Sequence, residues 1–215
     1  QNFSFVKRGG PDSVLILSGD HVYSMDYRPM IEFHEESGAD ITLAAIPVPL
    51  DEASRYGILG IGEDGRVTSF VEKPEQPPSN LANMGIYLFK LEVLNRLLWE
   101  DHLEKDSSHD FGKDILPKAV HGGELKVFAY PYHGYWMDVG TIRSYWQAHM
   151  DLLSEHPAYN LFDRGWTIHT RTEERPPVKV HRGAVVEDSL ICDGCVIEPG
   201  AVVRCSILSP GVVVQ

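Results

Sequence analysis

The C-terminal part of the chain repeats itself at an offset of 17 residues, and this repeat limits the possible folds more than any other feature. GAVVEDSL, which begins at Gly183, aligns with GAVVRCSI, which begins at Gly200, and Ser189 falls over Ser206. Within each copy, small residues recur roughly every six positions, and an aliphatic residue follows two positions after each. This rhythm is typical of a parallel β-helix, whose coils bury aliphatic side chains and turn at glycine or polar corners. An ordinary pair of sandwich strands would not give identity at a fixed offset, so the pattern predicts that a β-helix begins within residues 179–215.

The residues before the repeat alternate between strand and helix patterns. Val14–Asp20 (VLILSGD) is a continuous apolar run, which predicts a strand covered on both faces in a parallel α/β sheet. Helical spacing follows it, and Ile41–Val48 is rich in β-branched residues, as the next buried strand would be. This order predicts a right-handed β-α-β crossover. Ligands bind at the carboxyl edge of such sheets, where the Ser-Gly-Asp exit of the first strand would lie.

The middle of the chain predicts a hairpin, a further strand and a polar loop. Residues 56–72 turn at Glu63-Asp64-Gly65 and end at Lys73-Pro74, where the proline is expected to hold Lys73 in extended geometry. Asn83–Phe89 predicts a strand, and Leu91–Leu98 has helical spacing. The stretch Ser107–Pro117 mixes His, Asp, Gly and Lys in a loop before a short helix, which is more typical of a site than of a surface.

WMDVGT at Trp136–Thr141 predicts a strand end that carries Asp138, followed by a helix capped by Thr141. Its apolar residues, which include Ile142, Tyr145 and Trp146, are expected to face inward. After Pro157 the periodic pattern stops. We therefore predict three parts, which are an α/β domain over 1–156, a linker over 157–178 and the repeat region over 179–215.

Composition excludes several classes of protein. The net charge of −12 argues against a nucleic-acid or anionic-membrane partner, because such partners attract basic patches. The chain is 43% hydrophobic and 23% charged, as in soluble globular proteins, and no apolar run approaches the ~20 residues that span a membrane. Three cysteines predict reduced thiols in a cytosolic setting. Cys192 and Cys195 fall on repeat positions, so we expect packing rather than zinc binding there.

Five motifs in order, followed by the hexapeptide-like repeat, resemble the glucose-1-phosphate adenylyltransferases, also called ADP-glucose pyrophosphorylases. The motifs are SGDH (Ser18–His21), FVEKP (Phe70–Pro74), NMGIY (Asn83–Tyr87), SSHDFGKD (Ser107–Asp114) and WMDVGT. FVEKP is shared across sugar-nucleotide pyrophosphorylases, whereas SSHDFGKD separates the ADP-glucose branch. The resemblance implies a Rossmann-like α/β nucleotidyltransferase domain, here incomplete, followed by a left-handed parallel β-helix.

The implied reaction joins ATP and glucose 1-phosphate into ADP-glucose and pyrophosphate, the precursor step of glycogen or starch synthesis, with Mg²⁺. Both substrates are anions, so catalysis consists mostly of positioning and charge neutralisation. Asp20 and Asp138 are expected to be the Mg²⁺ ligands, because hard carboxylate oxygens suit this ion. As isolated residues, each would instead be interpreted as a turn or helix cap. Asp20, Lys73 and Asp138 form the expected catalytic set.

The resemblance also implies a set of residues that bind the sugar phosphate. Lys73 is expected to contact the phosphate as a point charge, and Glu72 to accept hydrogen bonds from glucose hydroxyls. The alternative for this pair is an exposed ion pair worth about 0 to 1 kcal/mol. The full expected set is Gly57, Glu72, Lys73, Asn83, Gly85, Tyr87, Asp110 and Lys113. Asn83 stands where much of the family is expected to have serine.

The remaining expectations from the resemblance concern partners and location. Basic residues at the module junction are candidates for binding a metabolite effector. These residues are Arg164, Arg171, Arg175 and Lys179. The resemblance also implies a homo- or hetero-tetramer. The expected location is cytoplasmic, or a plastid in a plant.

We expect the 215 residues to be inactive alone, because the family's glycine-rich nucleotide loop and the strand before it are not found in them. Three alternatives stay open. They are a nucleotidyltransferase for another sugar 1-phosphate, a catalytically silent regulatory subunit, and an acyltransferase. The acyltransferase is disfavoured, because its catalytic histidine would lie in the coils, and His181 precedes the repeat that begins at Gly183.

Overall fold

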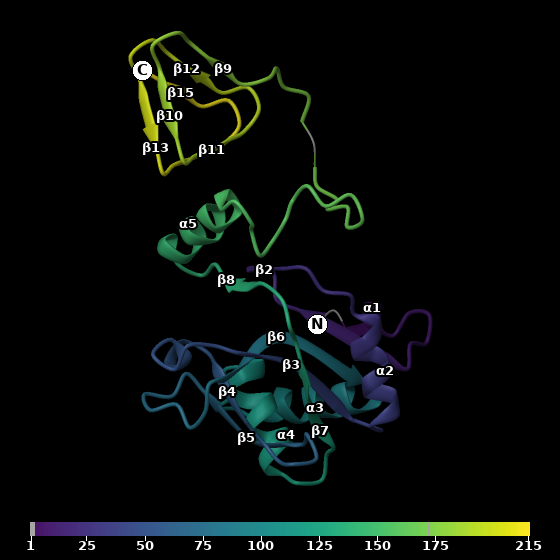
Figure 1. Ribbon diagram of the computed structural model, residues 1–215. Helices are drawn as coiled ribbons and strands as arrows, with labels where there is room; N and C mark the ends of the chain where they lie inside the picture. Colours follow the sequence, from purple (N-terminus) through teal and green to yellow (C-terminus); the bar gives the residue numbers. More distant parts are fainter. Residues whose placement is uncertain (1–2, 172) are drawn as a thin grey trace. The chain divides into compact units, whose positions relative to one another are not determined.

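The computed structural model describes residues 3–171 and 173–215 (Figure 1). Contacts divide the chain into two compact units. The first comprises the residues up to Gly19 together with Met25–His133, and the second comprises Asp20–Ser24 together with Gly134–Gln215. The short segment Asp20–Ser24 thus leaves the first unit and joins residues more than a hundred positions later in the chain.

The first unit is built on a mixed six-stranded sheet. Its strands are β1 (Ser13–Leu17), β3 (Ile41–Pro47), β4 (Gly57–Ile61), β5 (Val67–Glu72), β6 (Leu81–Lys90) and β7 (Val127–Pro131). The order is β5-β4-β6-β3-β7, and β1 also pairs with β6. Only β3 and β7 pair in parallel, whereas β6 is antiparallel to β1, β3 and β4. The predicted hairpin is confirmed as β4 and β5, with Gly57 opposite Glu72.

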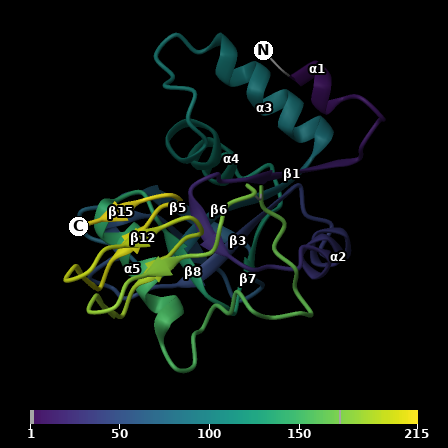
Figure 2. The same cartoon turned by 90° about the horizontal axis from the view of Figure 1, so that it is seen from above.

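Helices cover both faces of this sheet (Figures 1 and 2). They are α1 (Phe3–Val6), α2 (Arg28–Glu36), α3 (Leu91–Leu103) and α4 (Leu116–His121), with a 3₁₀ turn at Ala53–Arg55 and a π-helical turn at Phe111–Ile115. Alternation along β3 explains the two layers. Ile41 and Leu43 belong to one core with the apolar residues of α3 and α4, while Thr42 hydrogen-bonds His34 of α2 on the other face. The expected Rossmann-like α/β arrangement is confirmed in this unit.

The prediction for the first apolar run is partly wrong. Val14–Leu17 is a strand, as expected, but β1 pairs antiparallel with β6 and no other strand pair is found for it among the described residues. Its residues are half-buried, and Leu17 is exposed. A continuous apolar run indicates a strand with two covered faces only where neighbours flank it, and β1 lies at an edge.

The second unit contains an antiparallel pair, a helix and a series of short parallel strands. β2 (His21–Tyr23) pairs with β8 (Trp136–Asp138), and α5 (Ile142–Met150) runs into a 3₁₀ turn at Asp151–Leu153. The short strands are β9 (Lys179–Val180), β10 (Val185–Glu187), β11 (Leu190–Ile191), β12 (Val196–Ile197), β13 (Val202–Arg204), β14 (Ile207–Leu208) and β15 (Val213–Val214).

Every parallel pair among these short strands joins residues 17 apart, as in Val185 with Val202, Leu190 with Ile207 and Val196 with Val213. The sequence offset is therefore confirmed as a structural register. Among the small and aliphatic positions that the repeat singled out, Cys195, Ile197, Ala201 and Val203 are buried, whereas Val186 is 37% exposed.

The expected inward face of α5 is wrong. Thr141 does cap the helix, in a capping box with Ser144. However, Ile142 is 90% exposed, and Tyr145 and Trp146 are also exposed, while the buried positions are Ser144 and Ala148. The packed face of this helix carries small residues, so apolar periodicity pointed to the opposite side.

Within residues 3–171 and 173–215, no helix combines the length and the apolar character needed to cross a membrane.

Candidate active site

Glu72 lies at the centre of the residues predicted to bind a sugar phosphate. It ends β5, opposite Gly57 of β4, and its side chain is 21% exposed. A Cβ atom on Gly57 would lie 2.8 Å from Glu72 Oε2, and one on Gly112 would lie 2.6 Å from the same oxygen. Both distances are shorter than real contacts allow. Two glycines therefore let the backbone approach this carboxylate from two sides.

Lys73 does not have the extended geometry predicted for it. Its φ is +45°, in the left-handed region, while its backbone N–H continues the hairpin by donating to the Tyr56 carbonyl at 3.1 Å. Pro74 disfavours the right-handed helical region for the residue before it, and Lys73 adopts the left-handed one instead. Such a conformation costs a non-glycine residue of order 1–3 kcal/mol and is typical of functional sites. The Lys73 Nζ atom lies 3.9 Å from Glu72 Oε1.

Three further predicted residues lie on β6. Asn83 Nδ2 donates a hydrogen bond to the Tyr87 hydroxyl at 2.9 Å, and Asn83 Oδ1 accepts one from the backbone N–H of Gly85. Burial raises the pKa of Tyr87 to about 12, so its hydroxyl stays protonated. Since the Tyr87 oxygen accepts from Asn83, its own proton can be donated elsewhere.

Asp110 and Lys113 lie in the same neighbourhood. Asp110 caps the π-helical turn by accepting from the backbone N–H of Lys113 at 3.0 Å, and Phe111 contacts the Tyr87 ring at a centroid distance of 5.7 Å. Burial raises the pKa of Glu72, with opposing effects of Lys73 and Lys113 and a further upward effect of Asp110. All eight predicted sugar-phosphate residues therefore lie in the first unit, on the β4–β5 hairpin, β6 and the π-helical turn.

Asp20 and Asp138 come together in the second unit. The β2–β8 pairing sets His21 opposite Asp138, and Val139 N donates to the Asp20 carbonyl at 3.2 Å. The two aspartates thus occupy adjacent ends of one antiparallel pair. Asp138 Oδ1 accepts from Gly140 N at 2.8 Å, and Asp20 Oδ1 lies 3.6 Å from His21 Nε2. In the part of the chain that is described, no group of three or more His, Cys, Asp or Glu side chains forms a complete protein cage for a metal.

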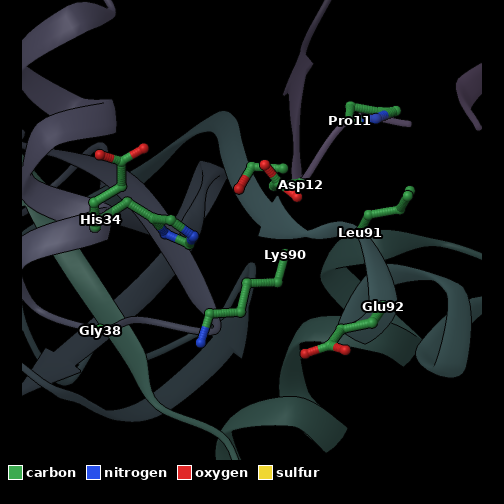
Figure 3. Close-up of a pocket in the computed structure, with 9 residues that line it drawn as sticks. Pro11, Asp12, His34, Gly38, Lys90, Leu91 and Glu92 are labelled. Atoms are coloured by element: carbon green, nitrogen blue, oxygen red, sulfur yellow. The ribbon is translucent and has the colours of Figure 1, made fainter. Parts of the chain in front are cut away.

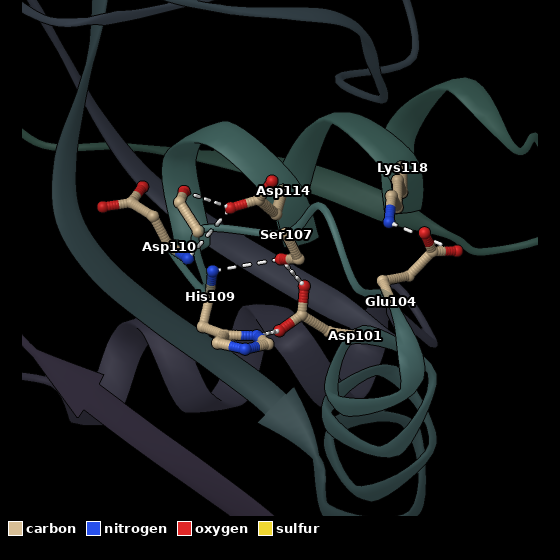
Figure 4. Close-up of polar contacts among 8 residues, drawn as sticks. Asp101, Glu104, Ser107, His109, Asp110, Asp114 and Lys118 are labelled. Atoms are coloured by element: carbon tan, nitrogen blue, oxygen red, sulfur yellow. Dashed lines mark hydrogen bonds and ion pairs between the residues drawn. The ribbon is translucent and has the colours of Figure 1, made fainter.

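The sequence did not point to every residue of this site. Gly112 was not singled out, although a Cβ atom on it would displace the Glu72 carboxylate. Asp101 of α3 was also missed, and it holds Ser107 and His109 by hydrogen bonds (Figure 4). A signal existed in its case, because Asp101 continues the spacing of Leu94, Leu97 and Leu98 on the apolar face of α3.

A pocket elsewhere in the first unit has a volume of about 460 Å³ and contains none of the predicted site residues (Figure 3). It lies between the segment before β1, the end of α2 and the start of α3, and both His34 and Lys90 line it. The Lys90 ammonium pairs with Asp40 at 2.8 Å.

The basic residues predicted for an effector all belong to the second unit. Arg164 and Arg171 are exposed in irregular segments, and Lys179 begins β9. Arg175 pairs with Glu173 at 2.7 Å and packs against Gly194 and Gly211 at the corners of the coils.

The first unit is thus an α/β domain, a sheet covered by helices on both faces with carboxylate, lysine and glycine residues gathered beside it. A comparison with protein families agrees, since residues 2–155 match the model described as nucleotidyl transferase. The chain belongs to the nucleotidyl transferase family.

Individual relatives narrow this class. The chain is 50% identical over 212 residues to a glucose-1-phosphate adenylyltransferase of Halalkalibacterium halodurans, covering 99% of the chain and 55% of the relative. It is 47% identical to the one from Geobacillus stearothermophilus, covering 99% and 54%, and 51% identical over 196 residues to the one from Thermomicrobium roseum, covering 91% and 45%. The chain spans about half the length of the curated relatives it matches.

Proposed function

We propose that this chain is part of an enzyme that transfers AMP from ATP to glucose 1-phosphate, giving ADP-glucose and pyrophosphate. The observation that supports this most is the gathering of Lys73, Asp110 and Lys113 around Glu72, whose carboxylate two glycines approach so closely that a Cβ atom on either would displace it. Relatives named glucose-1-phosphate adenylyltransferase favour this reaction over the transfer of another nucleotide.

The residues suit the chemistry of the sugar phosphate. Lys73 and Lys113 supply positive charge for a phosphate, and the half-buried Glu72 carboxylate accepts hydrogen bonds from sugar hydroxyls. Tyr87 offers a hydroxyl proton, because its oxygen already accepts from Asn83. Binding in one geometry lets the sugar phosphate oxygen attack the α-phosphorus in line, and no general base is needed for an ionised phosphate.

We also propose that Asp20 and Asp138 hold Mg²⁺. Two carboxylates at adjacent ends of the β2–β8 pair fit this ion, which is commonly bound by one or two carboxylates together with substrate phosphates and water. When bound, Mg²⁺ neutralises phosphate charge. Asp138 is oriented for this role by the hydrogen bond that its Oδ1 accepts from Gly140.

The parallel strands with a 17-residue register support the proposal that residues 179–215 begin a left-handed β-helix. The division into 1–156, 157–178 and 179–215, the effector site at Arg164, Arg171, Arg175 and Lys179, the tetramer and the cytoplasmic location stay predictions.

The test is to purify the full-length protein that carries this sequence and to incubate it with glucose 1-phosphate, MgCl₂ and each of ATP, UTP, CTP, GTP and dTTP. We expect ADP-glucose and pyrophosphate from ATP, and loss of product when EDTA removes the metal. Product from another nucleotide would favour a sibling transferase. Binding of glucose 1-phosphate without turnover would favour a silent subunit. The absence of both binding and turnover would contradict the proposal.

A further inference from the structure

Asp101 is a charged side chain buried at the C-terminal end of α3. It is 6% exposed, and it occupies the face of the helix whose other buried members are apolar. Burying a carboxylate is costly unless hydrogen bonds replace its water. Asp101 receives two such bonds, and both come from one segment of the SSHDFGKD motif.

The two bonds form a closed network with the backbone of that segment (Figure 4). Ser107 Oγ donates to Asp101 Oδ1 at 2.5 Å, and His109 Nδ1 donates to Asp101 Oδ2 at 2.7 Å. Ser107 Oγ in turn accepts from the backbone N–H of His109 at 3.0 Å. Burial raises the pKa of Asp101, but the hydrogen bonds from Ser107 and His109 outweigh this effect and hold the pKa below its ordinary value, so the carboxylate stays ionised.

His109 has a strained backbone at φ +60°, and the network holds it there. A second carboxylate, Asp114, binds the other side of the segment by accepting from Ser108 Oγ at 2.6 Å and from Asp110 N at 3.1 Å. Residues 107–110 are thus tied to α3 on one side and to the π-helical turn on the other. Asp110 follows the strained residue directly, so its direction depends on that conformation.

We infer that Asp101 is a positioning residue, which acts through Ser107 and His109 to hold Asp110 and Lys113 in place beside Glu72 for the sugar phosphate. This inference rests on the proposed function, because it assigns a purpose to the network within that site. Because Asp101 acts on the residues that bind the sugar phosphate and touches no reacting atom, its removal should weaken the affinity for glucose 1-phosphate and leave that for ATP nearly unchanged.

The experiment replaces Asp101→Asn in the full-length protein and measures KM for glucose 1-phosphate and for ATP separately. Asparagine keeps the shape but loses the charge and one acceptor, so we expect KM for glucose 1-phosphate to rise roughly 10-fold while KM for ATP changes less than about 2-fold. Hydrogen exchange at the amides of residues 109–113 should accelerate. The matched control is Glu100→Gln, an exposed carboxylate one position earlier on α3, and it should change neither quantity.

A second pair of variants keeps the test independent of whether Asp101→Asn folds. Ser107→Ala should reproduce the selective rise in KM for glucose 1-phosphate. Ser107→Thr retains the hydroxyl and should keep the KM of the unsubstituted protein. Equal rises in both KM values, or unchanged exchange at residues 109–113, would overturn the inference. If the unsubstituted protein forms no ADP-glucose, the proposed function fails, and the exchange measurement still decides whether Asp101 holds the segment.

Discussion

Lys73 combines a charged side chain with a left-handed backbone at the end of β5. For Lys73→Ala we expect KM for glucose 1-phosphate to rise about 10- to 100-fold, because a charge-assisted contact to phosphate is worth roughly 1.5–3 kcal/mol. KM for ATP should stay nearly constant. Steady-state kinetics with each substrate varied in turn measures both values, and equal rises would show that Lys73 only supports the fold.

Lys73→Gly separates the charge from the backbone. It removes the same ammonium group, so it should weaken sugar-phosphate binding as much as alanine does. Glycine adopts φ +45° without strain, so the glycine variant should unfold at a higher urea concentration than the alanine variant. Identical unfolding midpoints would contradict the strain argument.

His34 predicts a pH dependence of stability. It is 3% exposed, its Nδ1 contacts Thr42 Oγ1 at 2.7 Å, and its Nε2 has no hydrogen-bond partner among the described residues. Burial lowers the pKa of His34, with a further downward effect of Lys90 and opposing effects of Asp40 and Glu35. Below its ordinary value of about 6.5, the unfolded chain therefore binds a proton that the native protein does not.

The unfolding free energy should accordingly have its full value above pH 6.5. It should decrease as the pH falls from there toward the lower pKa of His34 in the native protein. In His34→Gln this decrease should be smaller, while the exposed His156→Gln should behave as the unsubstituted protein. Urea titrations at several pH values between 7.5 and 5.5 measure the difference. A decrease of equal size in all three proteins would contradict the assignment.

At the scale of elements, the capping box of α5 is a local feature with a local effect. Thr141 accepts from Ser144 N at 3.0 Å, and Ser144 Oγ accepts from Thr141 N. Thr141→Ala should cost about 1 kcal/mol of unfolding free energy and should increase hydrogen exchange in the first turn of α5. Thr141→Ser keeps the hydroxyl and should cost much less. Equal losses in both variants would show that the methyl group, and not the cap, stabilises the helix.

The elements that the sequence predicted well are those whose pattern reflects one covered face. The β4–β5 hairpin, β6 and α3 were found from turn residues and periodicity, because these depend on neighbours in the chain. The exposed side of α5 and the half-exposed edge of β1 were predicted wrongly. Which face is covered depends on residues distant in the chain, and hydrophobicity alone does not report them.

The candidate site divides in the same way. Motifs identified Glu72, Lys73 and Asp110 by chemical type. They did not reveal the left-handed Lys73, because a following proline favours extended geometry. They did not reveal the close approach of Gly112, because it depends on how the π-helical turn meets β5. Asp101 gave a signal, as a charge within an apolar stripe, but its partners lie in a loop whose path the sequence does not specify.

At the scale of the whole molecule, a substitution in the core of the coils should destabilise the second unit and leave the stability of the first unit unchanged. Val203 is 4% exposed in the core of the coils, whereas its neighbour Val202 is 55% exposed. Val203→Ala should cost roughly 1–3 kcal/mol through lost burial and a residual cavity, and Val202→Ala should cost little. Hydrogen exchange should rise in residues 179–215 and stay unchanged in β3. Accelerated exchange in β3 would show that the two units unfold together.

The constant register of the coils has a consequence for changes in chain length. Since every parallel pair joins residues 17 apart, duplicating residues 183–199 inserts one full turn and leaves each inward position inward. An insertion of one residue inside a strand would instead turn the following side chains from core to solvent. This part of the gene should therefore tolerate duplications and deletions of whole turns while rejecting single-codon shifts, so that the molecule can lengthen only in steps.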